Sequence, residues 1–552
     1  MDGQRIYSGI PLRRGKACVN CRRRKIKCDG VQPMCGQCSR YATTFEDCEY
    51  VEEGLTKAQI LEEQISILQD RIDQLENPNW PASSIPLSQP LSGPSTSASR
   101  ITSSDTLGLR SLLTHFYLQQ TSDASMDEAS ANSMHAELPF IVLQALVHNF
   151  LHNAACFGFF LDTQAFHDAV TSTAECTLPQ VLLNVLCLWG VHLSRDPRIT
   201  AYEPAFLAHA LRSTAGSLAG THPRTVLHSI QASVLLAYYF IQNARLLEGR
   251  YHTSAAVSIA VSAGLHGIHT GGGGRSAAGA LPPPRDAGEQ GERISAFWAV
   301  LNLNNFWASA EGAPSNISYG EFGLAIDTPW PLDTLDYVEG SHLLPAQSSG
   351  TVSSFLADVP DNATSTAALR AKVGILFEVA TRLGGHIQED GVLPEHNDFI
   401  ALDRKIDAFT QALPAADSKC MLVVHMLCRG ATIQLHNRLQ YEHVTSRGKS
   451  LAAARAIHRI IEETDLQQLG AIDPVLAPLW ASACLVFIAE IQLAVRRQRT
   501  NGGGAKVEEL HAALNAVLSA MQLFASHCPL MRMRLDSVRQ ANVDAQIKAQ
   551  TE

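Results

Sequence analysis

The sequence predicts a mostly α-helical protein with a small cysteine-rich module, a short coiled coil, a flexible linker and a large all-α region. Three observations carry this prediction. Six of the 13 cysteines lie between residues 18 and 48, a heptad pattern follows over 55–76, and helical spacing of apolar residues dominates from about residue 136. With 552 residues, 46% of them hydrophobic, the chain is long enough for two or more units.

These observations divide the chain into five segments. They are a basic amino-terminal arm (1–16), the cysteine module (17–50), a linker and coiled-coil helix (51–76), a Pro/Ser-rich flexible linker (77–135) and an all-helical region (136–552).

The charge is unevenly distributed along the chain. The formal net charge is −10, yet residues 1–50 carry ten Lys/Arg against five Asp/Glu, a net of +5, so the remainder carries −15. A basic amino-terminal segment followed by an acidic remainder predicts a local module that binds a polyanion. The first residues lack a signal-peptide core, and no run of eighteen uncharged apolar residues occurs. We therefore expect a reducing interior compartment and no membrane partner.

The six clustered cysteines have the spacing of a metal site. They are separated by gaps of 2, 6, 6, 2 and 9 residues, which form two halves, each a C-x-x-C followed by a third cysteine: Cys18, Cys21, Cys28, Cys35, Cys38 and Cys48. In a reducing compartment such a cluster favours metal binding over disulfides. Two tetrahedral zinc ions need eight ligand positions, and six sulfurs fill them if two sulfurs bridge both ions.

The pseudo-symmetry of the two halves makes Cys18 and Cys35 the natural bridges. Cys21 and Cys28 then complete one site, and Cys38 and Cys48 complete the other. Two alternatives stay open: a single zinc with two spare thiols, and six cysteines without metal. A closed site of thiolates has no open position for substrate, so the metal would supply folding energy rather than catalysis.

This pattern resembles the fungal binuclear zinc-cluster family of transcription factors over residues 18–50. The matching features are "CRRRKIKCDG", Pro33 two places before the fourth cysteine, and Tyr50 after the last; the final gap of nine is longer than is usual in the family. The resemblance implies two zinc ions per chain, a nuclear protein and regulation of RNA polymerase II transcription through the transcription machinery.

Five basic residues occupy six positions between the second and third cysteines: Arg22, Arg23, Arg24, Lys25 and Lys27. The resemblance implies a short helix whose end points into the DNA major groove, with Arg24 and Lys25 as the base-contacting pair and a CGG-type triplet as half-site. Phosphates would account for most of the other charges. The alternative is a solvated basic face.

The heptad segment predicts a parallel two-stranded coiled coil. Isoleucine at position a and leucine at position d favour a dimer, and the predicted contact residues are Leu61, Ile65, Leu68, Ile72 and Leu75. Fewer than three heptads form a weak zipper alone. The alternative is one amphipathic helix packed on the protein's own body.

The region from residue 136 predicts an all-α domain, with a Gly/Pro loop at 270–290 and a polar loop near 340–365. Two blocks within 225–332 resemble the helical middle domain that accompanies fungal zinc clusters. The first is "AAVSIAVSAGLH"; the second comprises "RISAFWAVLNLNNFWASAEGAPSNIS" and "IDTPWP". The other cysteines are predicted to be buried, and metal binding by His252, His266 and His269 is the minor alternative to structural roles.

The sequence contains no complete phosphate-binding loop, no H-E-x-x-H and no G-x-S-x-G, so we expect no enzyme. The prediction is a sequence-specific transcription factor that binds double-stranded DNA as a homodimer. The alternative function is a zinc-cluster interaction protein with a protein or RNA partner and a ligand-sensing helical domain. Because helical bundles can hold small molecules between helices, a small-molecule effector is a further candidate partner.

Overall fold

The chain divides into two compact units, Met1–Ser99 and Arg100–Glu552. The computed structural model describes these residues: 17, 18, 21, 25–29, 35–39, 140–171, 179–194, 196–215, 222–268, 281–312, 315–318, 323–333, 350–385, 396–439, 443–501 and 505–551. The basic arm, the heptad segment with its five predicted contact residues, and the Pro/Ser-rich linker all lie outside them.

The first unit is described around its cysteines. One short helix, α2 (Gly36–Ser39), follows directly after Cys35. The five described cysteines form a buried cluster, against which Ala17 and Ile26 pack.

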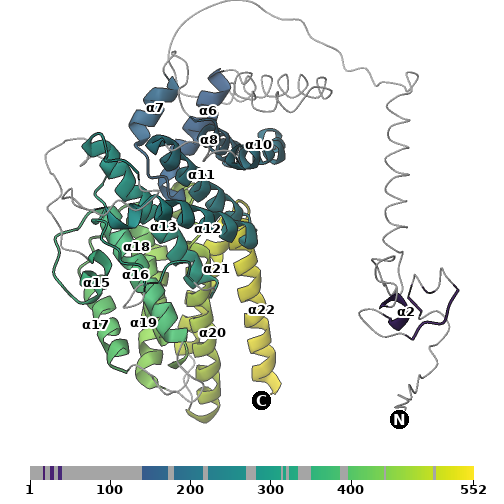
Figure 1. Ribbon diagram of the computed structural model, residues 1–552. Coiled ribbons are helices and arrows are strands. Elements are labelled where there is room, and N and C mark those ends of the chain that lie inside the picture. The colour runs from purple at the N-terminus through teal and green to yellow at the C-terminus, as the bar shows by residue number, and fades with distance from the viewer. Residues whose placement is uncertain are drawn as a thin grey trace, which may run out of the picture. The chain divides into compact units, whose positions relative to one another are not determined.

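The second unit is a bundle of helices, as predicted, and its described residues contain no strand (Figure 1). Its elements in chain order are α6 (Phe140–Leu151), η2 (Ala154–Phe157), α7 (Thr163–Thr171), α8 (Gln180–His192), α9 (Pro197–Thr200), α10 (Glu203–Ala215), α11 (Pro223–Gln242), α12 (Leu246–Ser262), η3 (Leu265–Gly267), α13 (Ala287–Ala310), α15 (Thr351–Leu356), α16 (Thr366–Gly385), α17 (His396–Gln411), α18 (Lys419–His436), α19 (Val444–Glu463), η5 (Leu466–Gln468), α20 (Leu476–Asn501), α21 (Ala505–Phe524) and α22 (Pro529–Thr551).

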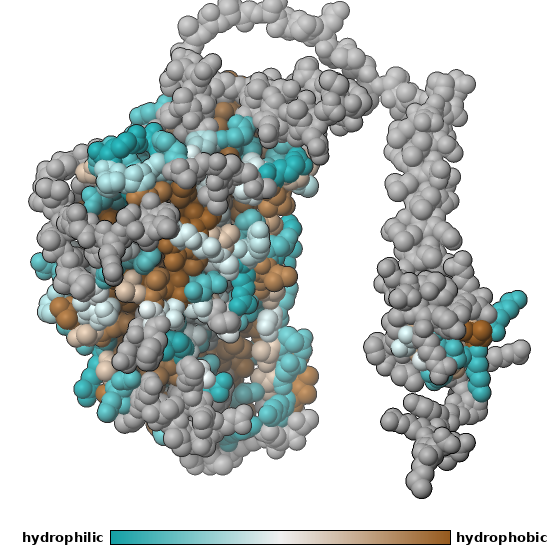
Figure 2. Space-filling model, in the orientation of Figure 1, coloured by the Kyte–Doolittle hydropathy of each residue, from teal (hydrophilic) through white to brown (hydrophobic). Residues whose placement is uncertain are grey.

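Helix α11 lies in the middle of this bundle. It contacts α8, α10, α12, α13 and α22, and most of its residues are buried. Three tryptophans from other helices, Trp189, Trp298 and Trp480, are also completely buried. Figure 2 shows hydrophobic residues across the middle of the visible face of this unit and hydrophilic residues above and below them. One continuous apolar core therefore holds the described helices together.

Two local features fix the positions of helices α6, α8 and α18. Helices α6 and α8 approach so closely that a Cβ at Gly190 would lie 2.3 Å from the carbonyl oxygen of Leu146, so only glycine fits there. Helix α18 begins after Ser418, whose hydroxyl accepts a hydrogen bond from the Met421 amide at 3.2 Å. This cap fixes Lys419 as the first residue of α18.

The predicted loops are partly corrected. Residues 281–286 precede α13 and are not helical, but α13 itself begins at Ala287, inside the loop expected at 270–290. The polar loop expected near 340–365 contains α15. This short helix forms because Val352 and Phe355 are buried in the core, which outweighs its polar neighbours.

Helix α20 is long and apolar enough to cross a membrane by length and composition alone. Trp480, Cys484 and Phe487 on it are completely buried against other helices. The apolar part of this helix therefore belongs to the core of the unit.

Candidate metal centre

Five of the six clustered cysteines come together in the first unit. The Sγ atoms of Cys18, Cys21, Cys28 and Cys35 all lie within 4.8 Å of one another. Cys38 joins them, because its Sγ lies 3.7 Å from that of Cys18. The sixth residue, Cys48, lies outside the described residues.

The sulfur spacing fits tetrahedral zinc. A zinc–sulfur bond of about 2.3 Å places the sulfurs of one tetrahedron about 3.8 Å apart. The Sγ atom of Cys35 lies 3.7 Å from that of Cys18 and 3.5 Å from that of Cys21. All five described cysteines are free thiols, and these distances are far too long for disulfides. The donor set therefore suits a thiophilic metal.

The two halves of the module repeat one local geometry. The amide of Cys21 donates to the Sγ of Cys18 at 3.4 Å, and the amide of Cys38 donates to the Sγ of Cys35 at 3.4 Å. The first cysteine of each C-x-x-C thus accepts an amide hydrogen bond and also lies near sulfurs of the other half. These are the two cysteines that sequence symmetry selects as bridges.

Asp29 joins the two halves and was missed by the sequence reasoning. Both of its carboxylate oxygens accept the Gly36 amide, at 2.9 and 3.1 Å, at the start of α2. A Cβ at Gly36 would lie 2.5 Å from the Asp29 carboxylate, so a larger residue would displace this contact. An acid after the third cysteine and a glycine after the fourth were the available signals.

The protonation of the thiols shows why the cluster needs a cation. Burial raises the pKa of Cys18, and burial raises the pKa of Cys21 to about 12. Burial acts in the same direction on Cys35, but hydrogen bonds from the Cys38 amide and from neighbouring thiols outweigh it and lower its pKa to about 6. Without a cation, packed sulfurs cannot all become thiolates, whereas a bound divalent metal stabilises all of them.

Two of the five predicted DNA-contacting residues are described, and both are exposed. Lys25 and Lys27 lie between the buried Cys21 and Cys28. A 3.1 Å hydrogen bond from the Ile26 amide to the Cys21 carbonyl closes a turn that contains Lys25, and Lys27 follows this turn. Lys25 has a φ of 51°, in the left-handed region that non-glycine residues seldom adopt. The remaining three, Arg22, Arg23 and Arg24, lie outside the described residues. The two lysine side chains are thus available to a polyanion.

Comparison with known protein families decides the class of the protein. The model of the fungal Zn(2)-Cys(6) binuclear cluster domain matches residues 16–57. The chain carries a fungal binuclear zinc-cluster domain. The model of the fungal specific transcription factor domain matches residues 146–341, in the helical unit. No curated protein and no solved structure matches the chain. This zinc-cluster protein is a DNA-binding transcription regulator whose cluster domain binds two zinc ions, and both matched domains are transcription factor domains rather than enzymes.

The motif residues of the transcription factor domain serve its packing. Trp298 stacks on Trp330 with their ring centroids 4.7 Å apart, and its indole N–H donates to the Pro329 carbonyl at 2.6 Å. Asn304 is buried and its Oδ1 accepts from the Asn316 amide at 3.1 Å. The contact between Trp298 and Trp330 joins "RISAFW" to "IDTPWP" in the core.

The histidines considered as metal ligands have structural surroundings. His252 is buried and stacks on Phe240, and burial lowers its pKa to about 4. The backbone carbonyl of His266 accepts from the Asp327 amide at 2.9 Å. His269 lies outside the described residues. Among the described residues, the cysteine cluster is the only group with the geometry of a metal site.

Most cysteines of the helical unit are buried, as predicted. Cys420 is only partly buried, and Cys176 lies outside the described residues. Burial raises the pKa of several of these thiols, to about 11 for Cys528 and about 12 for Cys484. They are therefore protonated core residues at neutral pH.

Proposed function

We propose that this regulator is a nuclear, sequence-specific factor for RNA polymerase II transcription that reads CGG-type half-sites in the DNA major groove as a homodimer. The observation that carries the proposal is the pair of exposed lysines, Lys25 and Lys27, beside a buried cluster of sulfurs with zinc spacing. The zinc fixes the short basic segment in one conformation, and the segment meets the DNA.

The proposed zinc ligands are Cys18, Cys21, Cys28, Cys35, Cys38 and Cys48. Cys18 and Cys35 bridge both ions, a role supported by their 3.7 Å separation and by the amide hydrogen bond that each accepts. Bound zinc supplies cross-links that a module of this size cannot obtain from an apolar core.

The basic residues divide into two roles. Arg24 and Lys25 reach the bases, because Arg and Lys donate well to the O6 and N7 acceptors of guanine. Arg22, Arg23 and Lys27 meet phosphates, which set affinity and register without reading sequence. The left-handed backbone at Lys25 is the kind of local strain that gathers at functional sites.

Dimerisation rests on the heptad segment. Ile at position a and Leu at position d favour a parallel two-stranded coiled coil, and we propose that the two helices come from two copies of the chain. Ile65→Asp places a charge in the seam, so we expect it to abolish dimeric DNA binding while zinc content stays at two per chain. Sedimentation of the wild type and of Ile65→Asp, each with and without DNA, measures dimerisation. A dimer that is unchanged in the variant would refute the coiled coil.

The deciding experiment selects random DNA duplexes with the zinc-loaded full chain and measures zinc in the same sample. We expect two zinc ions per chain and enrichment of paired CGG-like triplets, whose separation gives the half-site spacing. Two zinc ions without an enriched sequence would move the function to a protein or RNA partner.

Single substitutions test the division of roles. Lys25→Ala is expected to relax the preference for the triplet and to cost about 1–3 kcal/mol, whereas Arg22→Ala weakens all sequences alike. Binding is measured on CGG-containing and scrambled duplexes over a range of salt. Equal effects of both variants on both duplexes would contradict the assignment.

A further inference from the structure

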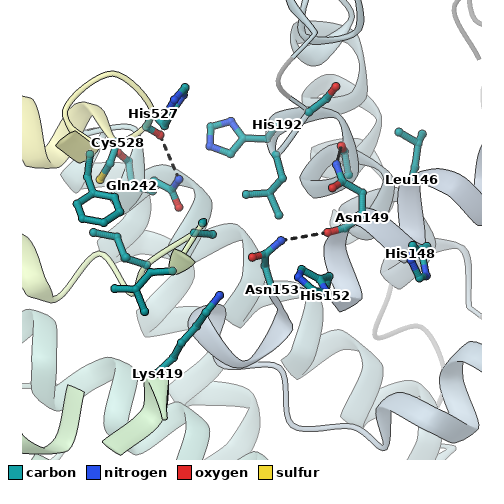
Figure 3. A pocket seen from close by; sticks show the side chains of 18 of the residues that line it. Leu146, His148, Asn149, His152, Asn153, His192, Gln242, Lys419, His527 and Cys528 are labelled. Atoms are coloured by element: carbon teal, nitrogen blue, oxygen red, sulfur yellow. Dashed lines mark hydrogen bonds between the residues drawn. The ribbon is translucent and has the colours of Figure 1, made fainter. Parts of the chain in front are cut away.

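The helical unit contains a cavity that neither matched family assigns. Its volume is about 510 Å³, and the walls come from α6, α8 and the end of α11 on one side (Figure 3). The other side comes from the first residue of α18, the segment 468–472 and the turn between α21 and α22. Pockets for small organic ligands in proteins measure about 300–1,000 Å³. The cavity therefore has room for a small molecule.

The charge of this cavity suits an anion. Of the residues that the structure describes, Lys419 is the only Lys or Arg that lines it, and no Asp or Glu does. Among the described residues no carboxylate forms an ion pair with Lys419, in contrast to Lys372, Lys405 and Lys449, each of which pairs with an aspartate. In Figure 3 the Lys419 side chain reaches up toward the space that Gln242 and Asn153 also line. An unpaired ammonium group in the wall of a cavity attracts a carboxylate or a similar anion.

A second group in the wall lacks a partner. Gln242 is only 6% exposed, and its Nε2 donates to the His527 carbonyl at 3.4 Å. Its Oε1 atom is buried and accepts no hydrogen bond within the described part of the chain. Buried acceptors are nearly always paired, and leaving one unpaired is unfavourable. A hydroxyl or amine group on a ligand would satisfy it.

A third group is held in a fixed orientation. His192 lines the cavity, and its Nδ1 lies 2.8 Å from the Oε1 of Glu203, which also accepts the Tyr239 hydroxyl at 2.6 Å. This arrangement makes Nδ1 the donor to Glu203 and leaves Nε2 for a ligand. Glu203 stands behind the histidine and not in the cavity wall, so it does not repel an anion directly.

The rest of the wall includes apolar side chains, namely Leu146, Ile199, Leu469, Ile472 and Phe524. Mixed walls of this kind orient a ligand through a few polar groups and gain affinity from its apolar body.

We propose that this cavity binds a small organic acid with an apolar body and a hydroxyl or amino group. The carboxylate pairs with Lys419, and the hydroxyl or amino group donates to Oε1 of Gln242. The ligand would join helices of the matched domain, 146–341, to segments outside it, including Lys419 and Phe524. Binding therefore stabilises the packing of the two parts against each other. Its role as the effector of the regulator rests on the proposed function.

The test uses the zinc-loaded full chain and three probes that differ by one group each. They are 2-hydroxy-3-phenylpropanoate, its uncharged amide, and 3-phenylpropanoate, which lacks the hydroxyl. Affinity is measured by equilibrium dialysis, and thermal unfolding is followed in parallel. We expect the hydroxy acid to bind saturably and to raise the unfolding temperature. The amide and the deoxy acid are expected to bind at least about 10-fold more weakly, the loss expected for one polar contact.

Two variants and a control assign the contacts. Lys419→Gln is expected to weaken binding of the hydroxy acid by at least about 10-fold and to leave the affinity for the amide unchanged. Gln242→Met keeps the side-chain volume and is expected to remove the preference for the hydroxy acid over the deoxy acid. The control is Arg250→Gln, which lies at a second cavity of about 240 Å³. This variant is expected to bind all three probes with the affinity of the wild type.

No saturable binding of the three probes, or equal affinity for the hydroxy acid in Lys419→Gln and wild type, would overturn the site. DNA binding is measured on the same samples with and without the hydroxy acid. If the acid binds and DNA binding does not respond, the site stands and its effector role fails. If the chain selects no DNA sequence but still binds the acid, the proposed function fails and the site stands.

Discussion

The two units of this protein are stabilised in different ways. In the described part of the zinc module, the buried side chains are five cysteines, with Ala17 and Ile26 packed beside them. The helical unit instead has one large apolar core that includes fully buried tryptophans and phenylalanines. The first unit depends on metal–sulfur bonds, and the second depends on burial of apolar surface. We therefore expect the DNA-binding module to unfold on loss of metal while the helical unit stays folded.

The cysteine-rich segment and the rest of the chain also differ in charge. Residues 1–50 carry a net charge of +5, while the remainder carries −15. A basic module on an acidic body favours DNA contact through the module alone. Within the acidic helical unit, the described residues of the cavity wall include a lysine and no carboxylate, which is why we propose an anionic ligand there.

Removal of zinc gives the largest expected difference between the units. Zinc in small structural modules contributes about 10–16 kcal/mol, which exceeds what a short segment can gain otherwise. A chelator is therefore expected to abolish DNA binding while leaving the helical circular dichroism and its thermal transition unchanged. Added zinc restores DNA binding. A lower transition temperature of the helical unit in the presence of chelator would show that its stability also depends on zinc.

Substitution of single cysteines sharpens the account of the module. Cys35→Ser removes a proposed bridge and is expected to lose both zinc ions, whereas Cys48→Ser removes a terminal ligand and is expected to retain more zinc. Zinc per chain is measured after dialysis, with Cys484→Ser as a control because this buried thiol belongs to the helical core. Equal zinc retention in the Cys35 and Cys48 variants would contradict the bridging scheme.

The sequence predicted the metal centre better than the cavity, for a physical reason. Cysteine gaps within 18–48 bring ligands together through short loops, so spacing alone indicates the site. The contact of Asp29 with the Gly36 amide also lies within this span, but polar residues of this kind are common in turns and carry a weaker signal. The wall of the cavity includes Gln242 and Lys419, which are far apart in sequence, and only tertiary packing brings them to the same cavity.

Helix α15 teaches the same lesson about the fold. Periodicity identified the long helices, but α15 has six residues, too few to give a pattern against polar neighbours. It forms because Val352 and Phe355 reach the core.

A change in the helical core is expected to affect the second unit alone. Trp298→Ala removes the stacking on Trp330 and the hydrogen bond to Pro329, and leaves a large void. Such truncations cost about 3–5 kcal/mol. Urea unfolding followed by circular dichroism measures the loss, and zinc content is expected to stay at two per chain. Loss of zinc in this variant would show that the two units depend on each other.

The smallest effect concerns the pH dependence of the helical unit. Burial lowers the pKa of His252 from its ordinary value of 6.5 to about 4, so the folded state holds this ring neutral while the unfolded state takes up a proton. Stability is therefore unaffected well above pH 6.5, falls as the pH drops below 6.5, and levels off near pH 4. At pH 5 the loss is about 2 kcal/mol.

His252→Phe keeps an aromatic ring against Phe240 and removes the titration. We therefore expect its free energy of unfolding, measured in urea, to rise by about 2 kcal/mol relative to the wild type between pH 7 and pH 5. The exposed His222→Asn serves as the control for loss of a histidine. A constant difference between wild type and His252→Phe over this range would mean that the buried ring is not held neutral.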